Sequence, residues 1–141
     1  MKKVLLVLLA VLLLSGCGNK NKAKDKVLTC NGVVSGLDTT ITVKYSAKKN
    51  ALSFAEVVYV MSLKDYTDYQ IEAIKSNDMC ANFKDYDFGD CSQKVVKKEL
   101  IVTASFDLDK LNKEDYGDNS LKLEEIKDKY EDQINGTCVI K

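Results

Sequence analysis

The chain has 141 residues with 21 basic and 21 acidic side chains, so its net charge is zero, and it contains no histidine, arginine, proline or tryptophan. Without histidine there is no imidazole base and no Ser-His or Cys-His pair. Without arginine there is no bidentate fork for phosphate or carboxylate. These absences exclude most familiar enzyme classes, and we expect neither an enzyme nor a cofactor. The lack of a basic excess also argues against nucleic acid as a partner.

The N-terminus has the layout of a secretory signal peptide. A lysine pair follows Met1, residues 4–14 are apolar, and a Ser-Gly pair stands directly before Cys17. The apolar run is shorter than the about 20 residues that a membrane-spanning helix needs, which favours a cleaved signal. The end of this stretch resembles the lipobox of bacterial lipoproteins, in which the cysteine sulfur takes a diacylglycerol and the chain is cut before it.

The lipobox resemblance implies that residues 1–16 are removed and that Cys17 anchors the mature chain through acyl chains such as palmitate. Two acyl chains hold a protein stably at a membrane, whereas one holds it marginally. Loss of residues 1–16 removes two lysines and no acid, which leaves a net side-chain charge of −2. The membrane is therefore an expected partner. We expect the protein on the extracytoplasmic side, on the cytoplasmic membrane of a Gram-positive host or the outer membrane of a Gram-negative one.

Cysteine pairing is the second feature that the sequence predicts. The chain has five cysteines, an awkward number for an exported protein. Assigning Cys17 to lipid leaves four, an even set in a compartment where disulfides persist. We favour Cys30–Cys138, because the first and last predicted strands would be neighbours in one sheet, and Cys80–Cys91, because these residues flank a short polar loop. No Cys-x-x-Cys motif is present, and the spacing does not suit zinc, so we predict structural disulfides.

Strands are predicted by apolar residues that alternate or run continuously. The clearest case is residues 99–108, where Leu100, Val102 and every second residue through Leu108 are apolar. Residues 51–61 are apolar on both faces in their later half, which predicts a central strand. Strands are predicted at residues 27–34, 39–46, 51–61, in the region 85–96 (where a polar loop is the alternative), at 99–108 and at 137–140.

A first helix is predicted after residue 62. Ser62 and Asp65 form a loose capping box, with aspartate in the place of the usual glutamate. The helix is expected to run to about Cys80 or Phe83. Its expected core face includes Ile71, and also Leu63, Tyr66 and Ile74.

A second helix is predicted at residues 121–134, with Asp118 or Ser120 as its N-cap. Its narrow apolar stripe consists of Leu123, Ile126, Tyr130 and Ile134. Gly136 is expected to end it in the left-handed conformation.

The element order β-β-β-α-β-β-α-β predicts an α+β fold, a mostly antiparallel sheet of about six strands with two helices on one face. Residues 17–26 are lysine-rich and polar and are expected to be a tether. Residues 27–141 would form a single domain, which we expect to be a monomer.

This layout resembles the YehR-like family of small bacterial lipoproteins, whose function is uncharacterised. The residues that carry the resemblance are the lipobox ending at Cys17, strand segments at 39–45 and 52–60, the segment 106–111 and a terminal helix ending at Gly136. The resemblance implies a lipid-anchored, single-domain extracytoplasmic protein. It implies no catalytic residues, because none are established for the family.

The loop that contains Asp85, Asp87 and Asp90 is a weak candidate for calcium, which prefers several oxygens on a turning backbone. The loop does not match the EF-hand pattern, because Gly89 and Asp90 are transposed and Val96 stands where glutamate is expected. We therefore favour a solvated loop closed by a disulfide and predict no metal.

Five tyrosines are candidates for a binding surface, with packing at a core or sheet rim as the alternative. They are Tyr59, Tyr66, Tyr69, Tyr86 and Tyr130. We expect a binding or interaction module for an unknown protein or small-molecule ligand. The alternatives are an extracytoplasmic hydrolase that uses paired carboxylates, and a structural envelope protein without a discrete ligand.

Overall fold

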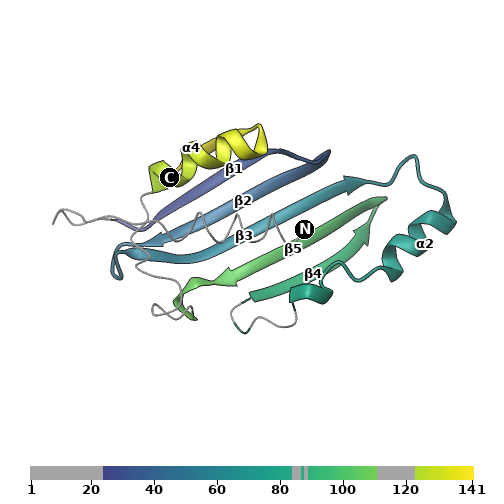
Figure 1. Cartoon of the computed structure of the whole chain (residues 1–141), viewed down its shortest axis with the longest axis horizontal. Helices are drawn as coiled ribbons and strands as arrows, with labels where there is room; N and C mark the ends of the chain where they lie inside the picture. The colour runs from purple at the N-terminus through teal and green to yellow at the C-terminus, as the bar shows by residue number, and fades with distance from the viewer. Residues whose placement is uncertain (1–23, 84–86, 88, 111–122) are drawn as a thin grey trace.

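The computed structural model describes residues 24–83, 87, 89–110 and 123–141. Its centre is a six-stranded sheet in the order β4-β5-β3-β2-β1-β6, and all neighbouring strands are antiparallel (Figure 1). The strands are β1 Lys26–Val34, β2 Leu37–Ser46, β3 Ala51–Ser62, β4 Gly89–Val96, β5 Glu99–Asp107 and β6 Thr137–Ile140. The predicted sheet is confirmed, and β3 is central as its two apolar faces indicated.

Two helices and two short 3₁₀ turns complete the described fold. They are α2 Asp68–Ser76, η1 Ala81–Phe83, η2 Leu108–Lys110 and α4 Leu123–Ile134. In Figure 1, α4 lies beside β1, whereas α2 lies at the far end of the sheet, between β3 and β4. Tyr59 of β3 packs against both the cluster that contains Tyr130 of α4 and the cluster that contains Ile71 of α2. The two helices therefore cover different parts of one sheet face, as the α+β prediction required.

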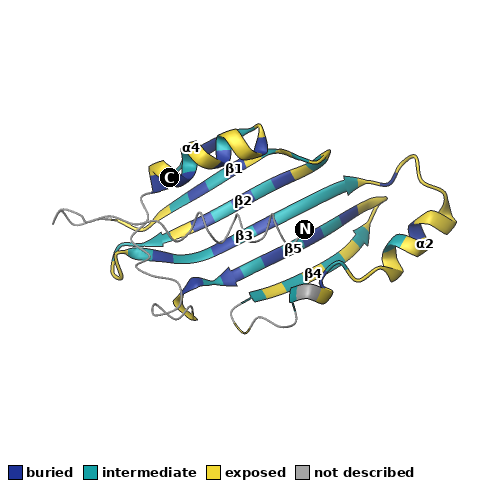
Figure 2. Ribbon diagram, in the orientation of Figure 1, coloured by how far each residue is buried: buried dark blue, intermediate teal, exposed yellow. Residues whose placement is uncertain are grey.

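Alternation along the strands builds this core face. Successive strand residues point to opposite faces. In β5, Leu100, Val102, Ala104 and Phe106 are buried, and the residues between them are less buried (Figure 2). The stripe predicted for the second helix is also confirmed, because its four apolar residues are the buried residues of α4.

The capping box predicted at Ser62 is wrong. Helix α2 begins later, with Thr67 as N-cap, and its capping box is completed by Gln70. The Thr67 backbone N–H donates to Gln70 Oε1 at 2.9 Å, and the Gln70 N–H donates to Thr67 Oγ1 at 3.3 Å. Glutamine at this position satisfies the usual pattern, whereas aspartate at position 65 is one methylene shorter than the usual glutamate.

Helix α2 is also shorter than predicted. It ends at Ser76, not near Cys80 or Phe83. The Ser76 hydroxyl donates to the Glu72 carbonyl at 2.9 Å, and Asp78 Oδ1 accepts the Cys80 N–H at 3.0 Å. The helix ends where Asn77 takes an extended conformation, with φ −86° and ψ 108°, and its N–H donates to the Ile74 carbonyl. The Asp78 side chain then bonds to the backbone of the next turn in place of a helical bond.

The end of α4 corrects the role predicted for Gly136. Asn135, not Gly136, has the positive φ, at 46°. A Cβ on Gly136 would lie 2.1 Å from the Asn31 carbonyl oxygen and 2.7 Å from the Gly32 Cα. Glycine is therefore required here by the close approach of the chain to β1, and asparagine supplies the left-handed residue. The caps predicted at Asp118 and Ser120 lie outside the described residues.

Both favoured cysteine pairs form disulfides in the structure. Cys30 of β1 lies directly opposite Cys138 of β6 in the antiparallel register. Val27 and Lys141 exchange both backbone hydrogen bonds, at 2.9 and 3.0 Å, and alternation from this pair makes Cys30–Cys138 a non-hydrogen-bonded pair. Side chains are closest at such pairs. The second disulfide joins Cys80 to Cys91, across a sequence separation of 11 residues.

Strand β1 begins at Lys26, one residue before the predicted strand, and the Asp25 carboxylate accepts the Ala47 N–H at 2.8 Å. Cys17 and most of the predicted tether lie outside the described residues. Within the described ranges, none of the helices has the length and apolar character that a membrane crossing demands.

Candidate functional site

An apolar pocket of about 160 Å³ opens on the core face, in the region between the parts covered by α4 and by α2. Strands β2, β3 and β5 form its floor, and α2 with the segment that follows it forms one wall. The lining residues are Leu37, Tyr59, Met61, Ile74, Asn77, Met79, Leu100 and Val102. The floor exists because core-face residues of β3 and β5 continue beyond the area that α4 covers.

No lysine or carboxylate belongs to this lining. Its polar side chains are the amide of Asn77 and the phenol of Tyr59. Transfer of an isolated charge into such surroundings is costly unless the charge is paired. The pocket is therefore suited to a neutral apolar group and not to an ion.

Tyr59, which is partly buried, neighbours the fully buried phenol of Tyr130 in α4. Burial raises the pKa of Tyr59. Burial also raises the pKa of Tyr130 far above its usual value, and the neighbouring Tyr59 raises it further. The Tyr130 hydroxyl is fully buried and has no hydrogen-bond partner in the part of the chain that is described. Both phenols are thus neutral at physiological pH, and each keeps a proton to donate.

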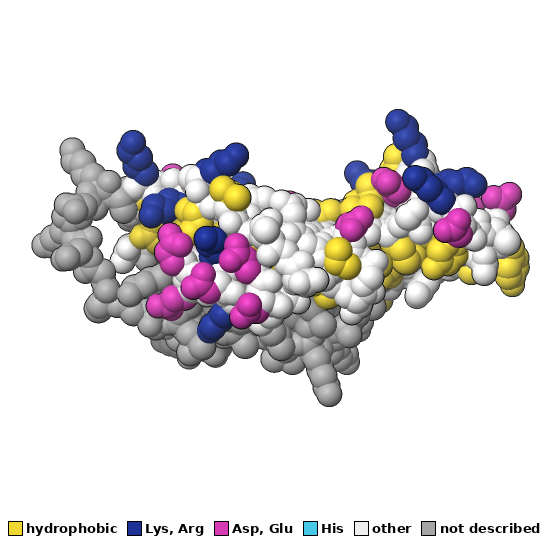
Figure 3. All heavy atoms as spheres, turned by 90° about the horizontal axis from the view of Figure 1, so that it is seen from above, with side chains coloured by type: hydrophobic (Ala, Val, Ile, Leu, Met, Phe, Trp, Pro, Cys, Tyr) yellow, Lys and Arg dark blue, Asp and Glu magenta, His cyan; other side chains and the backbone are white. Residues whose placement is uncertain are grey.

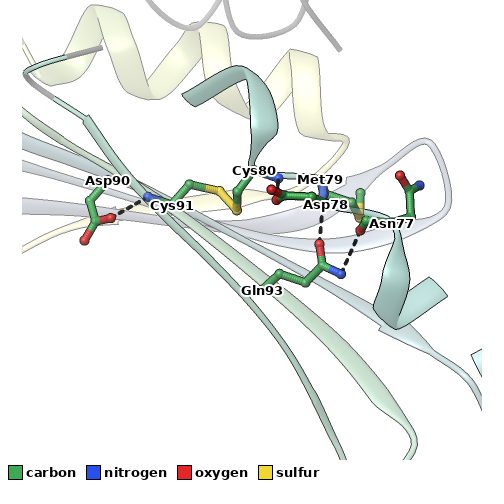
Figure 4. Close-up of a disulfide and its surroundings, with 7 residues drawn as sticks. All are labelled: Asn77, Asp78, Met79, Cys80, Asp90, Cys91 and Gln93. Carbon is green, nitrogen blue, oxygen red and sulfur yellow. Dashed lines mark hydrogen bonds between the residues drawn. A yellow bond between two sulfur atoms is a disulfide. The ribbon is translucent and has the colours of Figure 1, made fainter. Parts of the chain in front are cut away.

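The wall formed by residues 77–79 is held by one side chain of β4 (Figure 4). Gln93 Oε1 accepts the Met79 N–H at 3.0 Å, and Gln93 Nε2 donates to the Asn77 carbonyl at 3.0 Å and to the Ile74 carbonyl at 3.3 Å. The Cys80–Cys91 disulfide links the same segment to the same strand, since Cys91 lies two residues before Gln93 in β4. Two neighbouring side chains of β4 therefore fix the position of the pocket wall.

The aspartates of the calcium hypothesis do not form a described site. Asp85 lies outside the described residues, Asp87 is exposed, and Asp90 uses Oδ1 to accept the Cys91 N–H at 2.8 Å. No group of three His, Cys, Asp or Glu residues suited to a metal occurs among the described residues.

The candidate tyrosines do not form one surface. Tyr130 is fully buried, Tyr59 lines the pocket, and Tyr69 is 85% exposed on α2. Tyr66 is exposed just before the α2 N-cap, and Tyr86 lies outside the described residues. Of the candidate tyrosines that the structure describes, Tyr59 alone belongs to the pocket lining.

Acidic side chains gather away from the pocket, on the outward face of α4 (Figure 3). This face carries Glu124, Glu125, Asp128 and Asp132, interspersed with lysines. In the same view, hydrophobic side chains are visible at the end of the molecule that carries α2. The paired carboxylates that the hydrolase alternative requires are not brought together in this pocket.

Sequence reasoning missed most of the pocket. Met61, Leu100 and Val102 were predicted as strand residues, but no pattern indicated that part of their face stays open. The available signal was the number of apolar residues in the later half of β3, which exceeds what a short helix can cover. Asn77, Met79 and Gln93 carried no signal, because their roles depend on contacts between distant parts of the chain.

The fold and the pocket define a small, disulfide-linked α+β domain with an apolar pocket. No family model matches the chain, and no curated protein matches it. One solved structure, the NMR structure of a protein from Streptococcus pneumoniae TIGR4, is similar at 19% identity, covering 88% of this chain and 82% of that chain, with a TM-score of 0.42. At this TM-score the similarity carries no functional argument.

Proposed function

We propose that the protein is a lipid-anchored binding module on the extracytoplasmic side of a membrane, and that the apolar pocket is its binding site. The observation that carries the proposal is the open pocket of about 160 Å³ without a charged residue in its lining. Concave, largely apolar sites with a few polar groups are the usual form of ligand sites. A structural envelope protein without a ligand has no need to keep such a surface open to water.

The two disulfides support the location. They link all the described cysteines in pairs, and disulfides persist in oxidising compartments outside the cytoplasm. Their pairing leaves Cys17 as the remaining thiol of the five, in agreement with a lipid at that position. The anchor and the resemblance to the YehR-like family stay predictions.

Replacement of Cys17 by serine tests the anchor. We expect a labelled fatty acid to be incorporated into the wild-type chain but not into Cys17→Ser, and the variant to leave the membrane fraction. Protease added to intact cells, or to spheroplasts if there is an outer membrane, should digest the wild-type domain. Equal labelling of the two chains, or protection from protease, would contradict the proposed location.

Photo-crosslinking in intact cells tests the binding site. A photoreactive amino acid at Asn77, on the pocket rim, should give a discrete adduct. The same group at Tyr69, which is 85% exposed on α2 but absent from the lining, is the matched control. The adduct at position 77 should decrease when Ile74→Phe fills the pocket. Equal adducts at both positions, or adducts that Ile74→Phe leaves unchanged, would overturn the pocket as the binding site.

A further inference from the structure

We propose that the pocket binds the neutral aromatic side chain of a polypeptide, one ring of the size of phenylalanine or tyrosine. This inference rests on the proposed binding function and specifies the chemistry of the ligand.

Volume limits the group that enters the pocket. The pocket holds about 160 Å³. An apolar protein cavity of about 150 Å³ stays dry and accepts one benzene ring. The pocket therefore has room for about one such ring, and a larger group would extend out of its opening.

Lining chemistry selects a neutral aromatic group over an ion or an aliphatic one. The absence of a charged residue leaves a charged group without compensation. Met61 and Met79 present thioether sulfurs, which make favourable contacts with ring edges. The Tyr59 ring offers an aromatic surface for offset or edge-to-face packing. A saturated ring of equal size would lose these contacts.

The opening of the pocket indicates that the ring belongs to a larger ligand. Burial of a single ring gives affinity only in about the millimolar range, so further contacts outside the pocket are needed. Asn77 lies in the lining and is exposed, and its amide can both donate and accept a hydrogen bond. This amide can therefore pair with one peptide group next to the aromatic residue.

Methyl NMR titration of the full chain carrying Cys17→Ser tests the inference. The probes are N-acetyl-phenylalaninamide, toluene, methylcyclohexane and the charged compound benzoate. We expect saturable shifts at the methyl groups of Ile74, Met79 and Val102 with the first two probes. The capped amino acid should bind at least about fivefold more tightly than toluene, as one additional hydrogen bond predicts.

Two variants make the titration specific. Ile74→Phe should weaken binding of both aromatic probes by at least tenfold, whereas the matched variant Ile74→Val should retain it. Tyr69→Phe, on the exposed side of α2, should leave all affinities unchanged. The methyl spectrum without probe shows whether each variant is folded.

Three results would overturn the inference. They are equal affinity for toluene and methylcyclohexane, tighter binding of benzoate than of toluene, and no shift of the pocket methyl groups with any probe. If any one of these results is found while the adduct at position 77 persists in cells, the proposed ligand class is wrong and the binding function stands. If the probes bind but no adduct forms, the pocket chemistry stands and the proposed function fails.

Discussion

Single residues decide how closely the chain can pack in this domain. Gly32 and Gly136 face each other where the end of α4 returns to β1, and neither has room for a Cβ. Asn135 supplies the left-handed conformation beside them. In the same helix, α4, the buried hydroxyl of Tyr130 has no hydrogen-bond partner among the described residues. These positions combine tight packing with one unsatisfied polar group.

Replacement of Gly136 by alanine should lower the free energy of unfolding by about 1–3 kcal/mol, because backbone must move to admit the new methyl group. The new Cβ would lie 2.1 Å from the Asn31 carbonyl oxygen. Urea denaturation measures the change. Gly89→Ala is the matched control, since its Cβ would meet Phe106 at an ordinary 3.4 Å. Equal losses in the two variants would contradict the close-approach explanation.

Because of Tyr130, the free energy of unfolding should depend on pH in the alkaline range. Its pKa is raised in the folded state by burial and by Tyr59, so the native state retains a proton that the unfolded chain releases. The stability contribution is complete below the unfolded pKa of about 10 and decreases as pH rises through the folded pKa. We expect the free energy of unfolding to decline above about pH 10 in the wild type.

Tyr130→Phe should reduce this alkaline decline and should cost little or no stability at neutral pH, because it removes a hydroxyl that has no described partner. Urea denaturation from pH 7 to pH 11 provides the comparison. Tyr69→Phe, at an exposed position, serves as control and should follow the wild-type curve. A loss of several kcal/mol at pH 7 in Tyr130→Phe would show that the hydroxyl has a partner.

Among the elements, the segment between α2 and β4 depends most on side chains for its position. Among the described residues of this segment, η1 is the only regular element and no strand pairs with them. Two hydrogen bonds of Gln93, with Met79 and Asn77, and the Cys80–Cys91 disulfide attach it to β4. A third hydrogen bond of Gln93 reaches the Ile74 carbonyl in α2. The wall of the pocket is therefore attached by side chains, whereas its floor is part of the sheet.

Two substitutions should separate the contribution of the acceptor Oε1 of Gln93 from that of its donor Nε2. Gln93→Glu keeps an acceptor for the Met79 N–H but loses the donor to the carbonyls of Asn77 and Ile74. Gln93→Ala loses both. We expect hydrogen exchange at the Met79 amide to accelerate about fivefold or more in Gln93→Ala and clearly less in Gln93→Glu, since one net hydrogen bond contributes about 1 kcal/mol. Identical exchange in the two variants would argue against the acceptor role.

At the scale of the whole molecule, the described residues form one sheet and two helices that cover unequal parts of it. Helix α4 buries four apolar residues against the sheet, whereas α2 buries only Ile71. The smaller helix leaves part of the core face open, and the pocket lies there. The disulfides act at the same scale, because one joins the two ends of the domain and the other attaches the wall of the pocket.

Removal of each disulfide should have a distinct effect. Cys30 and Cys138 are 108 residues apart, whereas Cys80 and Cys91 are 11 apart. In the chain-entropy model, the long closure contributes about 4–5 kcal/mol and the short one about 3 kcal/mol. Paired serine variants, compared by thermal unfolding, should show the larger loss for Cys30/Cys138. Only the Cys80/Cys91 variant should disturb the methyl resonances of Met79.

The local sequence was sufficient to predict the strands and helices whose apolar residues recur with a regular period. Alternation in β5 and the four-residue stripe of α4 were predicted correctly, because side-chain periodicity directly reflects a buried face. The Cys30–Cys138 pair followed from expected adjacency of the terminal strands. The start of α2 was assigned to the wrong polar residue, because several residues near it resemble a cap.

Only the tertiary structure decided the features that depend on residues distant in sequence. The approach of Gly136 to Asn31, the Gln93 contacts with the pocket wall, and the open part of the core face each join segments that share no periodic signal. Whether an apolar residue is covered or lines a pocket depends on how far the neighbouring helix reaches. The sequence by itself therefore determined the sheet and its buried face, and the short reach of α2 across that face determined the site.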